Sequence, residues 1–165
     1  MMRLLGLDPG LNRTGWGVIE ATANRLVYVA DGVVESDASL SLAERLATIY
    51  DGLKRVIDEY RPEEAAVEET FVNVNAQSTL KLGHARGVAM LAAVQAGSPV
   101  FEYTPAEVKR AVVGYGRAEK HQVGQMVKLL LGLASVPRPH DATDALAVAI
   151  CHAHAAPRPA LTAAV

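Results

Sequence analysis

The chain has 165 residues, of which 50% are hydrophobic and 21% are charged, and its formal net charge is −2. That length and composition are typical of one compact globular domain. The single cysteine, Cys151, excludes a disulfide framework and fits a reducing cytoplasm. Arg3 and Asp8 come too early to leave room for the apolar core of a signal peptide, and no apolar run approaches the roughly 20 residues of a membrane helix. We therefore expect a cytoplasmic protein with no membrane partner.

The small net charge hides an uneven distribution of charged side chains. Residues 1–69 carry 7 basic and 13 acidic side chains, whereas residues 81–128 carry 7 basic and 3 acidic ones. A basic binding face beside an acidic site that holds cations would give this pattern. An ordinary solvated surface would give it too, so the charge alone identifies no partner.

The first third of the chain predicts three strands and a helix. Residues 3–8 are a short apolar run before a Pro-Gly turn, and residues 14–22 and 25–35 are rich in β-branched and aromatic residues. A short turn separates the second and third strands, which predicts that they pair antiparallel. Ser41 and Glu44 then form a capping-box pattern, followed by apolar residues at helical spacing.

The rest of the chain alternates between strands and helices. The patterns predict strands at 64–68 and 99–103 and helices at 76–96, 105–112, 118–132 and 141–154. Three early strands followed by this alternation predict an α/β fold with a mixed sheet covered by helices on both faces. We expect one domain over residues 1–155 and a flexible tail over residues 156–165.

Four carboxylates lie where the predicted elements end. Asp8 closes the first strand, Glu68 closes the fourth, and Asp141 and Asp144 open the last helix. Ligands of open α/β sheets gather outside the carboxyl ends of the strands. Clustered carboxylates repel one another unless cations neutralise them, and Mg²⁺ and Mn²⁺ prefer oxygen ligands. Two such ions roughly 3.5–4 Å apart can serve the attacking water and the leaving oxygen in phosphodiester hydrolysis.

Each carboxylate also has a purely structural interpretation. Asp8 before Pro-Gly is a common turn residue, and Glu68 is a plausible surface charge, with Glu69 beside it as an equal candidate. Asp141 suits a helix N-cap, and Asp144 suits the first helical turn. The combination is more informative, because Asp8 and Glu68 both end short apolar strands of the kind found in the centre of a sheet.

Motifs spread over most of the chain appear in a distinctive order. They are Asp8-Pro9-Gly10, residues 14–19 (TGWGVI), Val67-Glu68 with Phe71, residues 80–83 (LKLG), 85–88 (ARGV), 99–103 (PVFEY), 112–114 (VVG) and 118–120 (AEK), and Asp141 with 144–147 (DALA). Together they resemble the RuvC family of Holliday-junction resolvases, the crossover junction endodeoxyribonucleases of the RNase H-like superfamily.

The resemblance implies an RNase H-like fold, with a five-stranded mixed sheet of three antiparallel and then two parallel strands. It implies a homodimeric endonuclease that resolves four-way junctions during recombination and repair, by metal-dependent cuts in two opposing strands that leave ligatable nicks. The RuvA and RuvB branch-migration proteins would be its partners. The implied catalytic metal ligands, for two Mg²⁺ or Mn²⁺ ions per site, are Asp8, Glu68, Asp141 and Asp144.

The resemblance also suggests which residues hold DNA. Phe71 would contact junction bases, and Lys120 would lie nearest the scissile phosphate. The basic side chains between residues 81 and 120 are phosphate-contact candidates: Lys81, Arg86, Lys109, Arg117 and Lys120. His140 has two open interpretations, an additional metal ligand or an exposed loop histidine.

The helix predicted at 76–96 is rich in glycine and alanine, which permits close approach of its own sheet or of a second subunit. Three competing hypotheses remain at this point. A related nuclease would cut RNA–DNA hybrids, an actin-like ATPase would use Asp8-Pro9-Gly10 as a phosphate loop, and an inactive scaffold would only bind junctions. The preferred cleavage sequence, the favoured metal, the bridging carboxylates and the dimer contacts do not follow from the sequence.

Overall fold

The structure, a computed structural model, describes residues 1–69, 75–155, 157 and 160–161. The expected tail therefore lies largely outside the described residues. Ten elements follow one another along the chain. They are β1 (Met2–Asp8), β2 (Arg13–Thr22), β3 (Arg25–Glu35), α1 (Leu42–Tyr60), β4 (Glu64–Glu68), α2 (Ala76–Gln95), β5 (Val100–Tyr103), α3 (Pro105–Val113), α4 (Lys120–Leu130) and α5 (His140–His154).

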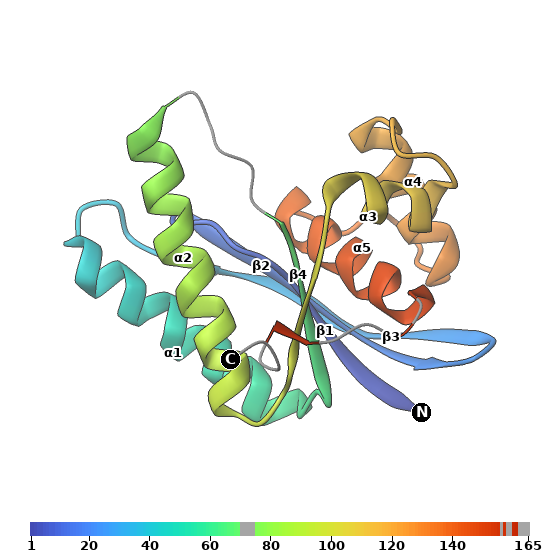
Figure 1. Cartoon of the computed structure of the whole chain (residues 1–165), viewed down its shortest axis with the longest axis horizontal. Helices are drawn as coiled ribbons and strands as arrows, with labels where there is room; N and C mark the ends of the chain where they lie inside the picture. The colour runs from blue at the N-terminus through green and yellow to red at the C-terminus, as the bar shows by residue number, and fades with distance from the viewer. Residues whose placement is uncertain (70–74, 156, 158–159, 162–165) are drawn as a thin grey trace.

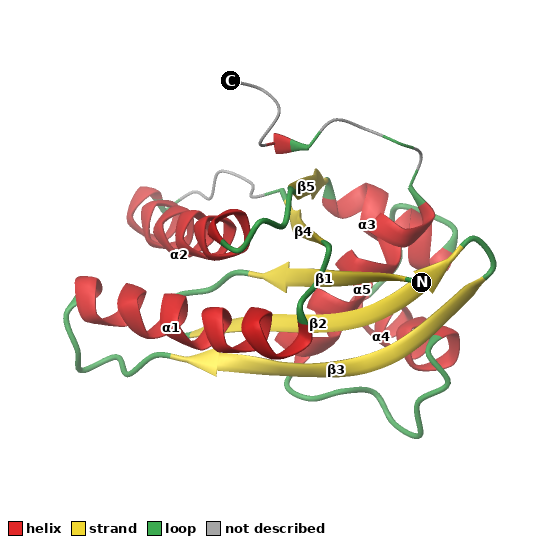
Figure 2. Ribbon diagram, turned by 90° about the horizontal axis from the view of Figure 1, so that it is seen from below, coloured by secondary structure: helices red, strands yellow, loops and turns green. Residues whose placement is uncertain are grey.

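The five strands form one mixed sheet in the order β3-β2-β1-β4-β5. β1, β2 and β3 pair antiparallel, and β4 and β5 pair parallel to β1 and to each other. Helices α1 and α2 cover one face, and α3, α4 and α5 cover the other (Figure 1, Figure 2). The expected sheet, with three antiparallel and then two parallel strands between helical layers, is confirmed. No helix in the described part of the chain is both long and apolar enough to cross a bilayer.

The alternation of side chains along β1 and β4 decides what faces α5. Leu5 and Leu7 pack into the core formed with α1 and α2, whereas Leu4 packs into the core formed with α5. Successive residues of a strand point to opposite faces, so Asp8 projects to the α5 side, as Leu4 does. By the same alternation Glu68 faces α5, because Ala66 packs into the α5 core.

Glycines let α5 lie unusually close to the sheet. A Cβ built on Gly6 would stand 1.9 Å from the carbonyl oxygen of Ala145, and one built on Gly15 would stand 2.0 Å from that of Asp141. A Cβ on Gly17 would meet Leu146 at 2.6 Å. Glycine inside a strand signals a close backbone approach, which here brings the start of α5 against the end of β1.

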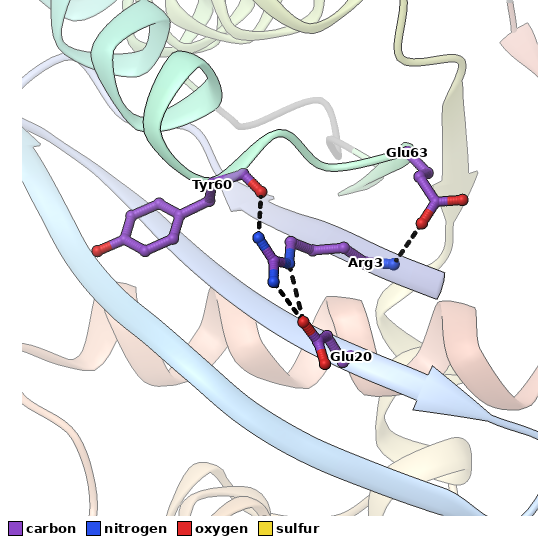
Figure 3. A network of polar contacts seen from close by, with 4 residues as sticks. All are labelled: Arg3, Glu20, Tyr60 and Glu63. Atoms are coloured by element: carbon purple, nitrogen blue, oxygen red, sulfur yellow. Dashed lines mark hydrogen bonds and ion pairs between the residues drawn. The ribbon is translucent and has the colours of Figure 1, made fainter. Parts of the chain in front are cut away.

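Arg3 joins four elements at the opposite end of the sheet (Figure 3). Its guanidinium donates to the carboxylate of Glu20 on β2 and, at 2.8 Å, to the backbone carbonyl of Tyr60 at the end of α1. Its backbone N–H donates to Glu63 at 3.1 Å, just before β4. These contacts fix how α1 leads into β4, and so they align β4 beside β1.

The predicted helix boundaries hold with two corrections. The capping box at Ser41 and Glu44 opens α1 as expected. The last helix begins at His140 with Pro139 as its N-cap, so the interpretation of Asp141 as an N-cap is wrong. The fourth helix begins at Lys120 rather than 118, because Glu119 is its N-cap. These shifts put Asp141 inside the first turn of α5.

Candidate active site

The four predicted carboxylates come from three elements that meet on the α5 side of the sheet. Asp8 ends β1 and lies opposite Gly15 of β2, and Glu68 ends the neighbouring parallel strand β4. Asp141 and Asp144 lie in the first turns of α5. This end of the helix can lie against the sheet because Gly15 has no side chain. The fold thus brings together residues more than 130 positions apart in sequence.

Mutual repulsion and burial perturb these groups. Burial, followed by the negative charges of Asp144, Asp141 and Glu68, raises the pKa of Asp8 from 3.8 to about 8. Burial, with the charge of Asp144 next, raises the pKa of Glu68. The pKa of Asp144 is raised by burial as well. A group of buried carboxylates whose pKa values are all raised is common at functional sites.

Two basic side chains partly neutralise the cluster. Lys120 forms an ion pair with Asp144 at 3.1 Å, and Arg13 forms one with Asp141 at 3.5 Å. Burial acts to lower the pKa of Lys120, but the carboxylates, with Asp144 foremost, outweigh it and raise that pKa. Lys120 is therefore held as a cation beside the acidic group, and its place at the scissile phosphate stays a prediction.

A cleft of about 210 Å³ opens next to the carboxylates. Glu68, Asp144, Lys109 and Lys120 line it, with the apolar side chains of α3 and α4 behind them. The charge of Lys109 acts to lower the pKa of Glu68, which places this lysine near the same carboxylate. A cleft lined by both carboxylates and lysines suits an anionic ligand, such as a phosphate group, that binds together with metal cations.

The donor set fits divalent metal ions. The four predicted acidic ligands on the three elements offer carboxylate oxygens, which hard cations prefer. Within the described residues, no three acidic or histidine side chains already point at one common position. Two of the carboxylates are instead in ion pairs, Asp141 with Arg13 and Asp144 with Lys120.

The remaining DNA-contact candidates lie in different environments. Lys81 and Arg117 are exposed. The Arg86 side chain is only 16% exposed and forms an ion pair with Glu102 of β5, which favours a role in holding α2 to the sheet. Its contact with phosphate stays a prediction. Phe71 lies outside the described residues.

His140 is exposed at the first position of α5 and contributes a charge effect on Asp144. The loop position expected for it is wrong, because it begins a helix, and its role as a metal ligand stays a prediction. Nothing in the sequence indicates a role for Arg13, which resembles any surface arginine. Its contact with Asp141 arises only because α5 packs beside β2. Sequence reasoning also assigned no role to Gly15, although a glycine within a strand pattern signals close packing.

Comparisons with known proteins agree over nearly the whole domain. Residues 4–152 match the profile of the family described as crossover junction endodeoxyribonuclease RuvC. The chain belongs to this RuvC family. The RuvC of Rhodospirillum rubrum is 63% identical over 153 residues, covering 93% of this chain and 90% of that protein. The RuvC of Paramagnetospirillum magneticum is 61% identical, covering 93% of this chain and 92% of that protein.

Solved RuvC structures share the fold as well. Thermus thermophilus RuvC in complex with a Holliday junction substrate is 38% identical and has a TM-score of 0.87, with 93% of both chains covered. The yeast mitochondrial Holliday junction resolvase Ydc2 is 11% identical with a TM-score of 0.65, covering 92% of this chain and 79% of that chain, so it shares the fold alone. Membership of the RuvC family favours the junction nuclease over the ATPase and RNA–DNA hybrid hypotheses.

Proposed function

We propose that this RuvC-family chain cuts four-way DNA junctions symmetrically in two opposing strands, and so acts in recombination and repair. The observation that carries the proposal is the meeting of Asp8, Glu68, Asp141 and Asp144 on one face of the sheet, where Glu68 and Asp144 line a cleft. An acidic cluster with basic side chains at its rim suits hydrolysis of a phosphodiester. A location in the cytoplasm, with the DNA, is part of the same proposal.

The four carboxylates would hold two Mg²⁺ or Mn²⁺ ions. Bound cations of this kind supply the charge that makes water a strong nucleophile at neutral pH and that stabilises the departing 3′ oxygen. The chain itself supplies the ligands and their orientation. Because burial and repulsion raise the pKa of Asp8, the site favours uptake of either protons or cations.

Lys120 and Lys109 would act on the phosphate. Lys120 forms an ion pair with Asp144, and Lys109 lines the same cleft. Their ammonium groups would bind the non-bridging oxygens and stabilise the negative charge that grows in the transition state. Arg13 pairs with Asp141 at the edge of the cluster and would release that carboxylate when cations bind. Phe71 would contact the junction bases.

Cleavage of a synthetic four-way junction tests the function directly. We expect paired nicks at symmetric positions with Mg²⁺ or Mn²⁺, no cleavage in excess EDTA, and little cleavage of an RNA–DNA hybrid. Mapping the cut sites on all strands and religating the products would measure symmetry and ligatable ends. Equal activity on the hybrid, or full cleavage in EDTA, would contradict the proposal.

A homodimer would provide the two active sites that symmetric cleavage requires. The α2 surface supports this arrangement. Its buried side chains are Ala85, Ala89, Ala92 and Ala93, whereas Leu80 is 64% exposed and Leu91 is 48% exposed. RuvA and RuvB remain the proposed cellular partners of the dimer.

Replacing Gly87 with leucine is expected to weaken dimerisation. A Cβ at Gly87 meets no heavy atom within 4 Å in the described part of the chain, so the monomer should tolerate the larger side chain. Sedimentation at micromolar concentration would report the change, with Ala47→Leu on the exposed face of α1 as the control. A wild-type chain that stays monomeric while cleaving junctions fully would refute the dimer.

A further inference from the structure

Helix α5 carries half of the acidic cluster and packs directly on the sheet. Gly6, Gly15 and Gly17 form the floor beneath it, and small side chains such as Ala145 and Ala149 face that floor. The Leu146 side chain lies over Gly17, where a Cβ would meet it at 2.6 Å, so packing sets part of the position of α5. Polar contacts of α5 add to this packing and help to set how far Asp141 and Asp144 reach over Asp8.

The polar contacts at the start of α5 use the carboxylates of the site itself. Asp141 pairs with Arg13 of β2, and Asp144 pairs with Lys120 of α4. Thr143 donates to the carbonyl of Pro137 at 2.6 Å, a local contact with the preceding loop. When the carboxylates turn toward cations and Lys120 turns toward phosphate, the two ion pairs must rearrange. They cannot serve as fixed anchors through the reaction.

A second set of contacts, about 12 Å further along the helix at 1.5 Å per residue, does not involve the carboxylates. His152 contacts a carboxylate oxygen of Glu64 through Nε2 at 2.6 Å and the hydroxyl of Tyr103 through Nδ1 at 2.5 Å. A carboxylate only accepts hydrogen bonds, so Nε2 donates to Glu64 and, in the neutral ring, Nδ1 accepts from Tyr103. The Phe101 ring lies against the imidazole, with centroids 4.5 Å apart.

Both partners of His152 belong to the part of the sheet that carries Glu68. Glu64 begins β4, the strand that Glu68 ends. Tyr103 lies beside Glu68 in the β4–β5 register and accepts a hydrogen bond at its carbonyl from the Glu69 N–H at 2.7 Å. The three side chains therefore connect α5 directly to the strand that positions the catalytic glutamate.

Hydrogen bonds and two aromatic rings hold His152 in place. The side chain is 8% exposed, yet a cavity of about 430 Å³ opens beside it, lined by Glu64, Phe101, Tyr103 and His152 among others. A ring next to such a space has room to move once its hydrogen bonds are lost. Buried hydrogen bonds to both ring nitrogens hold the orientation well, because leaving either nitrogen unpaired costs free energy.

We propose that His152, held by Glu64 and Tyr103, is a positioning residue that fixes α5 along β4 and so keeps Asp141 and Asp144 aligned with Asp8 and Glu68. The proposal rests on the proposed metal-dependent cleavage and adds a residue outside the cleft to it. Misplacement of reacting groups by about 1 Å can cost roughly 100-fold in rate, so loss of this contact should reach the distant site.

The test compares His152→Phe, which keeps a flat ring and removes both hydrogen bonds, with two controls in the full chain. His154→Phe makes the same change at an exposed position two residues away. Ile49→Val removes one buried methyl group from α1, on the other face of the sheet, and matches a general loss of stability. Mn²⁺ binding by the protein without DNA, followed by electron paramagnetic resonance, gives a readout that does not depend on cleavage.

We expect His152→Phe to weaken Mn²⁺ binding and to slow single-turnover cleavage about tenfold each, while junction affinity stays within about twofold. Both controls should bind Mn²⁺ and cleave like the wild type. Glu64→Gln retains an acceptor oxygen and should behave nearly like the wild type. If His152→Phe does not fold, Tyr103→Phe removes a single hydroxyl and should show a smaller change in the same direction.

Mn²⁺ binding and cleavage that match Ile49→Val at equal stability would reduce His152 to an ordinary structural contact and overturn the proposal. A wild-type chain that binds Mn²⁺ but cuts no junction would instead contradict the proposed function. In that case the Mn²⁺ comparison between His152→Phe and His154→Phe would still decide whether His152 positions the carboxylates.

Discussion

Replacing Asp8 with asparagine is expected to abolish junction cleavage while junction binding persists or strengthens. The change keeps the size of the side chain and removes the charge that draws cations to the centre of the cluster. Loss of about 4 kcal/mol of transition-state stabilisation corresponds to a rate roughly 10³-fold lower. Binding should not suffer, because one fewer negative charge then faces the phosphates. Cleavage kinetics and gel-shift titrations of the same junction measure the two effects.

Asp58→Asn is a matched control, since the Asp58 side chain on α1 is 64% exposed and lies on the opposite face of the sheet. It should cleave like the wild type. Strong residual cleavage by Asp8→Asn with the metal present would exclude Asp8 from the catalytic group. If both variants lost cleavage equally, the cause would be the change in the net charge of the protein and not the loss of a catalytic carboxylate.

The same substitution should change stability in a pH-dependent way when EDTA is present. The folded-state pKa of Asp8 is about 8, against 3.8 for the ordinary group, so the folded state holds this proton more tightly. Protonated Asp8 therefore contributes to the free energy of unfolding. This contribution is fully present below about pH 4 and is lost as the pH rises to about 8. Asp8→Asn should therefore melt higher than the wild type near pH 8 in EDTA, and the difference should shrink toward pH 4 or when Mn²⁺ is added.

Replacing Gly15 with alanine is the second change from which we expect a large loss. Its Cβ would stand 2.0 Å from the carbonyl oxygen of Asp141 and 2.3 Å from the carbonyl carbon, so the backbone of α5 must move. Overpacking of this kind costs roughly 1–3 kcal/mol of stability. A displacement of Asp141 and Asp144 by about 1 Å would lower cleavage roughly 100-fold. Thermal melts and cleavage assays on the folded variant test both effects.

Gly52→Ala gives the matching overpacked control. A Cβ there would meet the side chain of Val34 at 2.5 Å, between α1 and β3, on the face of the sheet away from the acidic cluster. It should lose stability without losing cleavage when assayed well below its melting temperature. If Gly15→Ala and Gly52→Ala cleave equally well, the close approach of α5 at Gly15 is not what aligns the carboxylates.

The sequence by itself determined the elements and their class. Period-2 and helical apolar patterns, the capping box at Ser41 and the alternation after residue 60 depend on local interactions, and each predicted element is present in the structure. The end of β1 at Asp8 was readable for the same reason, whereas the end of β4 left Glu68 and Glu69 as equal candidates until the spacing to Phe71 in the resemblance selected Glu68. The ordered motifs identified the family and, through the resemblance, the other two carboxylates.

The tertiary structure alone decided how these parts act on one another. The pKa of Asp8 reflects burial and three neighbours that are distant in sequence, and the pairing of Arg13 with Asp141 depends on where α5 lies. Arg86 reads as one more surface cation in the sequence, but the sheet sets Glu102 beside it. The contacts of His152 with Glu64 and Tyr103 span 88 and 49 positions of the chain. Contacts of that range leave no periodic mark in the sequence, because packing between elements rather than local backbone preference creates them.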